Sequence, residues 1–222
     1  MSETGKYIVI EGHDGTGKTE QAKRLRERLK KLGVKVCNFL VEEPDGATTE
    51  DGISLVPIAT EIRKILKNGS LERDPYVDVQ LFTAARRANW VQAMEPALDR
   101  GEWVVTARSW WSTIAYQGSA AGVPYDVIEN TYTMSVGGSR YMNPDLGLIL
   151  DVDHAVREER IAKRGELEVL DTYESQPEDF QQRIKQGYID WAELKDIPLL
   201  DASGTPDEVE AAIWRHIEPL VT

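Results

Sequence analysis

The chain has 222 residues, of which 41% are apolar and 29% charged, and a formal net charge of −12. This length and composition predict one globular domain, residues 1–222, and the acidity argues against non-specific binding to nucleic acid or anionic membranes. Cys37 is the only cysteine, which excludes an intrachain disulfide and predicts a reducing, cytoplasmic location. The N-terminal apolar run, residues 7–10, is too short to cross a membrane.

A phosphate-binding motif follows the first predicted strand. Residues 7–10 predict a strand and residues 20–32 an amphipathic helix. Between them, residues 12–19 match the P-loop pattern G-x-x-x-x-G-K-[ST], whose backbone N–H groups point at a phosphate. The motif predicts that Lys18 reaches the outer phosphates of ATP and that Thr19 ligates Mg²⁺. The residues expected to bind ATP are Gly12, His13, Asp14, Gly15, Thr16, Gly17, Lys18 and Thr19.

Strand and helix patterns alternate along the rest of the chain. Further strands are expected within residues 34–41, 103–106, 145–153 and 197–200. Helices are expected over 53–66, 76–98, 111–120, 124–135, 155–164 and 178–194, and from a capping box that begins at Thr205. Another capping box begins at Ser175, and residues 46–52 read as a loop. The alternation predicts an α/β, three-layer, five-stranded parallel sheet flanked by helices, the P-loop NTPase fold.

Ligands of such sheets bind at the carboxyl ends of the strands. Those ends carry the P-loop, Glu42, Glu43 and Arg108. A basic cluster, Arg157, Arg160 and Arg164, precedes a charged loop. Arginines that close over phosphates would suit phosphoryl transfer, which depends on positioning and charge neutralisation. A solvated helix face explains the cluster equally well. No base-reading motif of GTPases is found, and Arg108 at a strand end together with the arginine cluster favours a small-molecule kinase.

Taken together, these motifs resemble the thymidylate kinases, a family of nucleoside monophosphate kinases, along nearly the whole chain. The resemblance rests on residues 7–19, 82–86, 108–117, 143–152 and 163–174. It implies transfer of the γ-phosphoryl group of ATP-Mg²⁺ to a pyrimidine deoxynucleoside monophosphate, with dTMP converted to dTDP. It also implies a homodimer.

The resemblance assigns roles to individual residues. Phe82 would stack on the pyrimidine and Arg86, one helical turn later, would bond a base carbonyl; from spacing alone, Phe82 is more simply a core residue. Arg108 would hold the acceptor phosphate, and a lid over about residues 157–176 would bring arginines to the transition state. The residues expected to be catalytic are Lys18, Arg108, Arg160, Arg164 and Asp14. The residues expected to bind the acceptor are Phe82, Arg86, Arg108, Thr113, Tyr116, Gln117 and Tyr173.

Two positions depart from the family pattern. Ala107 replaces the aspartate of an Asp-Arg pair that helps to organise Mg²⁺, and Glu42 replaces an arginine expected near the acceptor phosphate. In an active enzyme, Asp14 and Glu43 could take over contacts to the metal and its water, with Thr19 as the direct ligand. A modified pyrimidine substrate or a weakly active relative would also explain the departures.

Two other functions stay open at this point. In a deoxynucleoside kinase, Glu43 of the Glu43-Pro44 pair would act as general base on a 5′-hydroxyl. A nucleotide-binding regulatory module would bind ATP without turnover. An assay that compares thymidine with dTMP as acceptor distinguishes a deoxynucleoside kinase from a monophosphate kinase. Binding of ATP without formation of product would indicate the regulatory module.

Overall fold

A six-stranded sheet forms the centre of the molecule in the computed structural model, which describes residues 4–137, 140–164, 173 and 176–221. The strand order is β3-β2-β4-β1-β5-β6. The strands are β1 (Tyr7–Gly12), β2 (Phe39–Glu42), β3 (Gly46–Thr49), β4 (Val104–Ala107), β5 (Leu146–Asp151) and β6 (Leu199–Asp201). All neighbours pair in parallel except β2 and β3. The predicted α/β fold class is confirmed.

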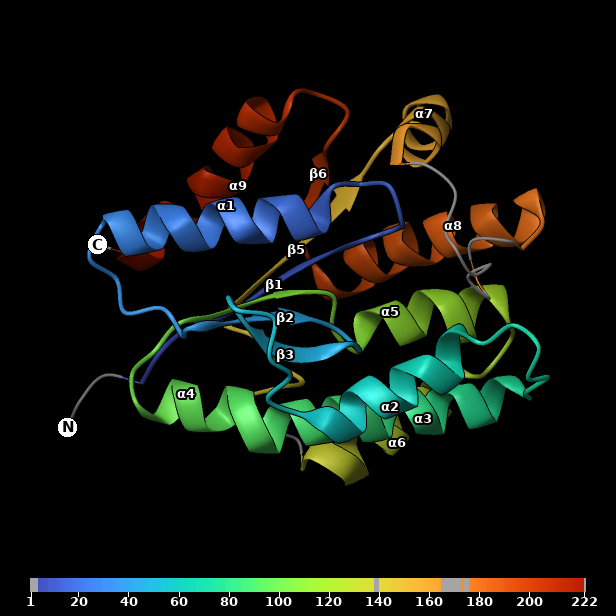
Figure 1. Ribbon diagram of the computed structural model, residues 1–222. Helices are drawn as coiled ribbons and strands as arrows, with labels where there is room; N and C mark the ends of the chain where they lie inside the picture. The colour runs from blue at the N-terminus through green and yellow to red at the C-terminus, as the bar shows by residue number, and fades with distance from the viewer. Residues whose placement is uncertain (1–3, 138–139, 165–172, 174–175, 222) are drawn as a thin grey trace.

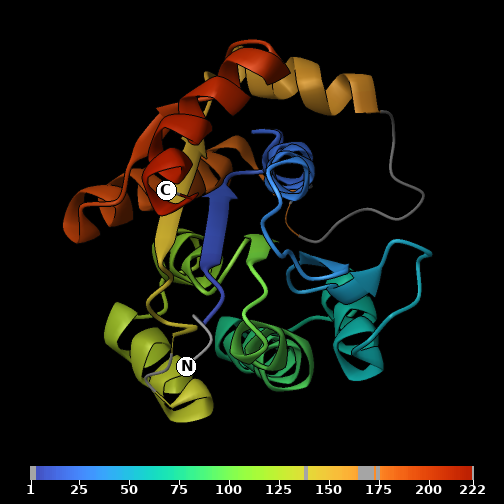
Figure 2. The same ribbon diagram turned by 90° about the vertical axis from the view of Figure 1, so that its left-hand side faces the viewer.

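Helices cover both faces of this sheet (Figure 1; Figure 2). On one face lie α1 (Lys18–Lys31) and α9 (Pro206–Val221). On the other lie α3 (Pro75–Asn89), the π-helix η1 (Trp90–Met94), α4 (Glu95–Asp99), α5 (Trp111–Thr113), the π-helix η2 (Ile114–Ala120), α6 (Tyr125–Val136) and α8 (Glu178–Lys195). α2 (Pro57–Lys67) packs on α3, and α7 (His154–Arg164) follows β5. Among the described residues, no helix is long and apolar enough to span a bilayer.

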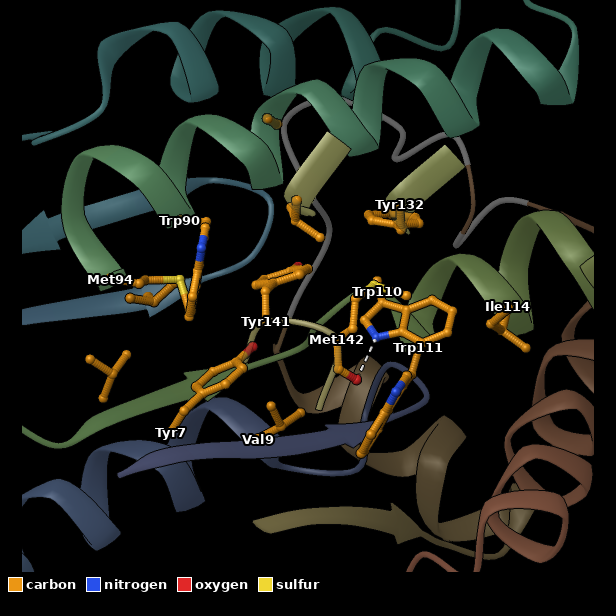
Figure 3. Close-up of a cluster of buried hydrophobic side chains, with 14 of the residues drawn as sticks. Tyr7, Val9, Trp90, Met94, Trp110, Trp111, Ile114, Tyr132, Tyr141 and Met142 are labelled. Atoms are coloured by element: carbon orange, nitrogen blue, oxygen red, sulfur yellow. Dashed lines mark hydrogen bonds between the residues drawn. The ribbon is translucent and has the colours of Figure 1, made fainter. Parts of the chain in front are cut away.

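The side chains of β1 alternate between two cores. Tyr7 and Val9 point into an aromatic-rich cluster with Trp90, Trp110 and Trp111, which Figure 3 shows. Ile8 and Ile10 point to the other face, against apolar residues of α1 and α9. β1 is buried on both faces, and its apolar run at residues 7–10 is typical of a central parallel strand.

The prediction of five strands, all parallel, is wrong in one respect. Residues 46–52 were expected to be a loop, but Gly46–Thr49 is β3, antiparallel to β2 at the sheet edge. A tight turn makes this possible, since the Asp45 N–H donates to the Glu42 carbonyl at 2.8 Å. The buried Asn89 side chain of α3 accepts the Ala47 N–H at 3.3 Å and so docks the strand on the helix layer.

Several predicted boundaries also shift. The helix expected over residues 76–98 is interrupted by the π-helix η1, and the helix expected from residue 53 begins at Pro57, whose fixed φ and missing N–H suit a first helical position. In the strand expected over residues 34–41, only Val36 pairs, as an isolated bridge, before β2 begins at residue 39. The Thr205 capping box is confirmed by hydrogen bonds between Thr205 and Glu208, whereas Ser175 lies outside the described residues.

Candidate nucleotide-binding site

A cavity of about 210 Å³ lies where β1, β2 and β4 end, the edge at which parallel sheets bind ligands. The P-loop borders it on one side, and α2, α3 and η2 border it on the other. The lining residues are Asp14, Lys18, Thr19, Glu42, Glu43, Pro44, Asp45, Arg63, Lys67, Phe82, Arg86, Ala107, Arg108, Ser112, Thr113, Tyr116, Gln117 and Tyr173.

The P-loop conformation depends on its glycines. Gly12 has φ of 143°, and a Cβ there would lie 2.4 Å from the Leu150 carbonyl oxygen. The His13 carbonyl accepts hydrogen bonds from the Thr16 N–H at 3.3 Å and the Thr16 hydroxyl at 2.9 Å. Gly17, with φ of 85°, then leads into α1 at Lys18. The result is a turn whose backbone closes just before a helix N-terminus, the geometry that binds phosphate.

Asp14 connects the P-loop to the rest of the cavity. Its Oδ1 atom lies 3.2 Å from Lys18 Nζ and accepts a hydrogen bond from Arg108, and its Oδ2 atom accepts one from the Tyr116 hydroxyl at 2.8 Å. Burial raises the pKa of Asp14, but the charges of Arg108 and Lys18 outweigh it and hold the pKa well below its usual value. Burial and Arg108 lower the pKa of Lys18 to about 8. Substrate phosphates would therefore compete with Asp14 for these two cations.

Arg108 occupies a strained position at the end of β4. Its φ of 83° lies in the left-handed region, which costs a non-glycine residue about 1–3 kcal/mol and is concentrated at functional sites. The backbone is fixed there because the Arg108 N–H donates to the Ile10 carbonyl at 3.0 Å. Its Nη1 atom donates to the Ser112 hydroxyl at 3.2 Å. This conformation directs the guanidinium toward Asp14 and the cavity.

Glu11 organises the segment after Arg108 and was not singled out from the sequence. Its buried carboxylate accepts hydrogen bonds from the Ser109 N–H at 2.5 Å, the Ser112 hydroxyl at 2.9 Å and the Tyr188 hydroxyl at 3.0 Å. A carboxylate in an otherwise apolar strand was the signal available in the sequence, because such a group is buried only with partners.

Phe82 and Arg86 lie on the same face of α3 and both line the cavity. The guanidinium carbon of Arg86 lies 5.1 Å from the centre of the Phe82 ring. Arg86 Nε donates to Glu43 at 2.8 Å, and Nη1 donates to the Thr113 hydroxyl at 2.8 Å. The Tyr132 hydroxyl also accepts from Nη1, at 2.7 Å. These bonds hold a buried cation beside an aromatic ring, an arrangement suited to a base with a carbonyl acceptor.

Glu43 is the anion that pairs with Arg86. Its Oε2 atom also accepts a hydrogen bond from the Tyr141 hydroxyl at 2.7 Å, and its buried Oε1 atom has no hydrogen-bond partner among the described residues. Burial raises the pKa of Glu43 to about 7, against the opposing effects of Arg86 and Tyr141. Through its hydrogen bond with Arg86 Nε, Glu43 orients the Arg86 guanidinium.

Tyr173 lines the cavity beside Phe82 and Tyr116. Its ring centre lies 6.1 Å from that of Phe82 and 5.5 Å from that of Tyr116. The Tyr173 hydroxyl donates to Asp78 at 2.6 Å and accepts from Gln117 Nε2 at 2.9 Å. All seven residues expected to bind the acceptor line the cavity, and the five that make no hydrogen bond to Asp14 are together called the acceptor pocket below. They are Phe82, Arg86, Thr113, Gln117 and Tyr173.

Oxygen donors for Mg²⁺ line the cavity without forming a ready-made cluster. Thr19 lines it with the carboxylates of Asp14, Glu42, Glu43 and Asp45, and Ala107 contributes only a methyl group. No group of three or more His, Cys, Asp or Glu side chains within the described part of the chain could hold a metal ion. Mg²⁺ in nucleotide sites is bound largely by phosphates and waters. Thr19 and the unpartnered Oε1 atom of Glu43 fit that mode of binding.

The predicted lid arginines have separate placements. Arg157 Nε donates to the Asp14 carbonyl at 3.1 Å, against the P-loop. Arg160 donates to the Gly204 carbonyl at 3.1 Å, so it contacts the loop between β6 and α9 instead of the cavity. The side chain of Arg164 and lid residues 165–172, 174 and 175 lie outside the described residues.

Two cations of α2 line the cavity and were missed. Arg63 and Lys67 are one helical turn apart, and Arg63 Nε lies 2.6 Å from Asp45 Oδ1. Glu42, which was expected to repel the acceptor phosphate, lies 3.3 Å from Lys23 Nζ. The spacing of Arg63 and Lys67 was visible in the sequence, but the helix could not be oriented toward the site without its packing on α3.

Comparisons with known proteins identify the family of this chain. The sequence model of the family described as thymidylate kinase matches residues 10–213. The chain is 36% identical over 216 residues to the thymidylate kinase of Syntrophotalea carbinolica, covering 94% of this chain and 93% of that protein. It is 33% identical over 215 residues to that of Deinococcus radiodurans, covering 96% of each, and 33% identical over 220 residues to that of Burkholderia lata, covering 98% and 99%. The chain therefore belongs to the thymidylate kinase family.

Proposed function

We infer that this protein is an ATP-dependent nucleoside monophosphate kinase that converts dTMP to dTDP. The observation that carries the inference is the single cavity that joins Lys18 and Thr19 of the P-loop to the acceptor pocket around Phe82 and Arg86. A kinase of this class needs its donor and its acceptor in one cavity, because phosphoryl transfer is achieved mainly by positioning. Family membership supplies the acceptor class.

On the donor side, the backbone N–H groups of the P-loop and the Lys18 ammonium would hold the ATP phosphates. Thr19 and Glu43 would help to hold Mg²⁺, whose charge would neutralise part of the phosphate charge. Lys18 now lies against Asp14. When Lys18 moves from Asp14 to phosphate oxygens, one charge-assisted hydrogen bond replaces another. The free-energy cost of this move is therefore small.

On the acceptor side, Arg108, Arg63 and Lys67 would hold the monophosphate. Phe82 would stack on the pyrimidine, Arg86 would bond a base carbonyl, and Tyr116, Gln117 and Tyr173 would enclose the sugar and base. An acceptor phosphate oxygen attacks the γ-phosphorus as the bond to the β-phosphate oxygen breaks, releasing ADP. The attacking oxygen is already anionic, so no general base is needed.

The remaining assignments rest on the family resemblance. Arg160 and Arg164 would move in from the lid, residues 157–176, to neutralise transition-state charge and exclude water. For Arg160 this requires release from the Gly204 carbonyl. The proposed enzyme is a homodimer in a reducing cytoplasm and has no nucleic-acid partner.

An acceptor panel tests the function. ADP release is measured with ATP-Mg²⁺ and either dTMP, dUMP, dCMP or thymidine, and dTMP is expected to give the highest kcat/KM. Preference for thymidine would indicate a deoxynucleoside kinase with Glu43 as its base. ATP binding without product from any acceptor would indicate a regulatory module. A Lys18→Met variant, expected to be inactive, controls for contaminating kinases.

A further inference from the structure

Gln181 lies between the two substrate sites although it lines neither the P-loop side nor the acceptor side of the cavity directly. It belongs to α8 and is only 6% exposed. Its amide makes hydrogen bonds to four groups, which belong to the P-loop, to α7 and to the segment around Tyr173. A primary amide has two N–H donors and an oxygen with two lone pairs. Every hydrogen-bonding position of this buried side chain is therefore used.

The oxygen of the amide faces the P-loop side. Gln181 Oε1 lies 2.8 Å from His13 Nε2 and accepts from Arg157 Nη2 at 3.0 Å. Because this oxygen can only accept, His13 must carry its proton on Nε2. Burial and the neighbouring Arg157 lower the pKa of His13 to about 3, so the ring is neutral at physiological pH.

These contacts fix the backbone that shapes the phosphate site. The His13 carbonyl accepts from the Lys18 ammonium at 3.3 Å as well as from Thr16. Arg157, held by Gln181, donates through Nε to the Asp14 carbonyl at 3.1 Å. Gln181 thus restrains both residues that precede Gly15, one through its side chain and one through Arg157.

The nitrogen of the same amide faces the acceptor pocket. Gln181 Nε2 donates to the Tyr173 carbonyl at 2.7 Å and to the Gln176 carbonyl at 3.3 Å. The Tyr173 ring lies against Phe82 and Tyr116, as described above. The amide nitrogen of Gln181 therefore holds the backbone of Tyr173, and the amide oxygen of the same side chain holds the P-loop.

We propose that Gln181 is a positioning residue for both substrates: its amide oxygen sets the P-loop for ATP and its amide nitrogen sets Tyr173 against the acceptor nucleotide. The proposal rests on the proposed function and adds to it a residue that touches neither nucleotide. It follows that the two halves of the amide can be tested separately.

Two variants and a control make that separation. Gln181→Met keeps the length and shape of the side chain and removes all four hydrogen bonds. Gln181→Glu keeps the two acceptor contacts with His13 and Arg157 and removes both donors. Gln186→Met is the matched control on the same helix, because the exposed Gln186 amide bonds only Asp190, at 2.7 Å, among the residues that the structure describes.

Steady-state kinetics gives the first test. Gln181→Met should raise the KM for ATP and the KM for dTMP by about tenfold each, because small misplacements of binding groups weaken substrate contacts. Gln181→Glu should leave the KM for ATP within about threefold and raise only the KM for dTMP. The control should change neither. A purely structural role would lower the melting temperature of Gln181→Met and leave both KM values unchanged, and that result would overturn the proposal. An equal rise in the KM for ATP in Gln181→Glu and Gln181→Met would overturn it too.

Binding of ADP, followed by calorimetry without any acceptor, keeps the proposal testable if dTMP is not the substrate. The dissociation constant of ADP should rise about tenfold in Gln181→Met and stay within threefold of wild type in the other two variants. Wild-type protein that binds ADP but does not phosphorylate dTMP would refute the proposed acceptor alone. Unchanged ADP binding in Gln181→Met would refute the positioning role.

Discussion

Asp14 and Arg108 form an ion pair that joins the P-loop to the end of β4. The same carboxylate holds Lys18, so one acidic side chain engages the main cation proposed for each substrate. ATP and the acceptor would each draw one cation away from Asp14. The site is therefore held in shape by ion pairs that substrate phosphates can replace.

Replacing Arg108 should damage catalysis far more than folding. Arg108→Ala is expected to lower kcat/KM for dTMP by roughly 10²–10³-fold, the usual effect of removing one charge-stabilising donor. Arg183→Ala is the control, because Arg183 pairs with Asp179 and the Ala120 carbonyl on α8 and η2. A loss below about tenfold for Arg108→Ala, with the control near wild type, would contradict the role given to Arg108.

Lys18 should make nucleotide binding depend on pH. Its pKa is lowered from 10.5 to about 8, so its charge is lost above pH 8 and the dissociation constant of ADP should rise, at most about tenfold per pH unit. Calorimetry between about pH 6.5 and 9.5, which spans roughly 1.5 units on each side of this pKa, measures the change in the dissociation constant of ADP. Lys18→Arg stays charged, and its ADP binding should be flat over the same range.

The lowered pKa of Lys18 weakens ADP binding at high pH but raises the stability of the folded protein as the pH increases. Between about pH 8 and 10.5 the unfolded chain keeps a proton on Lys18 that the folded protein has lost. The contribution of Lys18 to the free energy of unfolding should therefore rise with pH across this window. An ADP affinity that does not weaken above pH 8 in wild type would rule out Lys18 as the titrating group.

Ala107→Asp should alter the metal requirement. Ala107 lines the cavity beside Glu42, its register partner on β2. A carboxylate there would orient metal-bound water, so the Mg²⁺ concentration for half-maximal activity should fall by about tenfold. Ala107→Asn controls for side-chain size. Identical Mg²⁺ curves for the aspartate and asparagine variants would show that this position does not influence the metal.

Gly147→Ala should destabilise the aromatic core. A Cβ at Gly147 would lie 2.1 Å from Trp111 Cη2, and such overpacking costs about 1–3 kcal/mol, or roughly 2–4 °C in melting temperature for each kcal/mol. Trp111→Phe removes the ring atoms that clash. In a double-mutant cycle, Gly147→Ala should therefore cost much less in the Trp111→Phe background. Additive effects would refute the contact.

The sequence predicted the elements with strong periodicity and missed what tertiary contacts decide. The order of strand, P-loop and amphipathic helix could be predicted, because the glycines of the loop are required by local geometry. β3 could not be predicted, since Gly46–Thr49 is a strand through its pairing with β2 and its contact with Asn89 of α3, both of which are tertiary contacts. The π-helix after Asn89 likewise has no local sequence signal.

For the site, recognisable spacing was sufficient where the residues share one helix. Phe82 and Arg86 lie together as a one-turn spacing requires. The orientation of Arg86 by Glu43 joins residues 43 positions apart, and no pattern within either segment could indicate it. Gln181 was missed for the same reason, because its partners come from three other segments of the chain.

The antiparallel strand β3 also affects how the sheet ends. Strands at a sheet edge expose unpaired backbone groups that can pair with another molecule and begin aggregation. Here the chain turns back after β3, so that Ser54 bridges Thr48 and the Leu55 N–H donates to the Ala47 carbonyl at 2.8 Å. The opposite edge, β6, is only three residues long and follows Pro198. Both margins of the sheet are thus poor templates for a second chain, which protects the protein against edge-to-edge polymerisation.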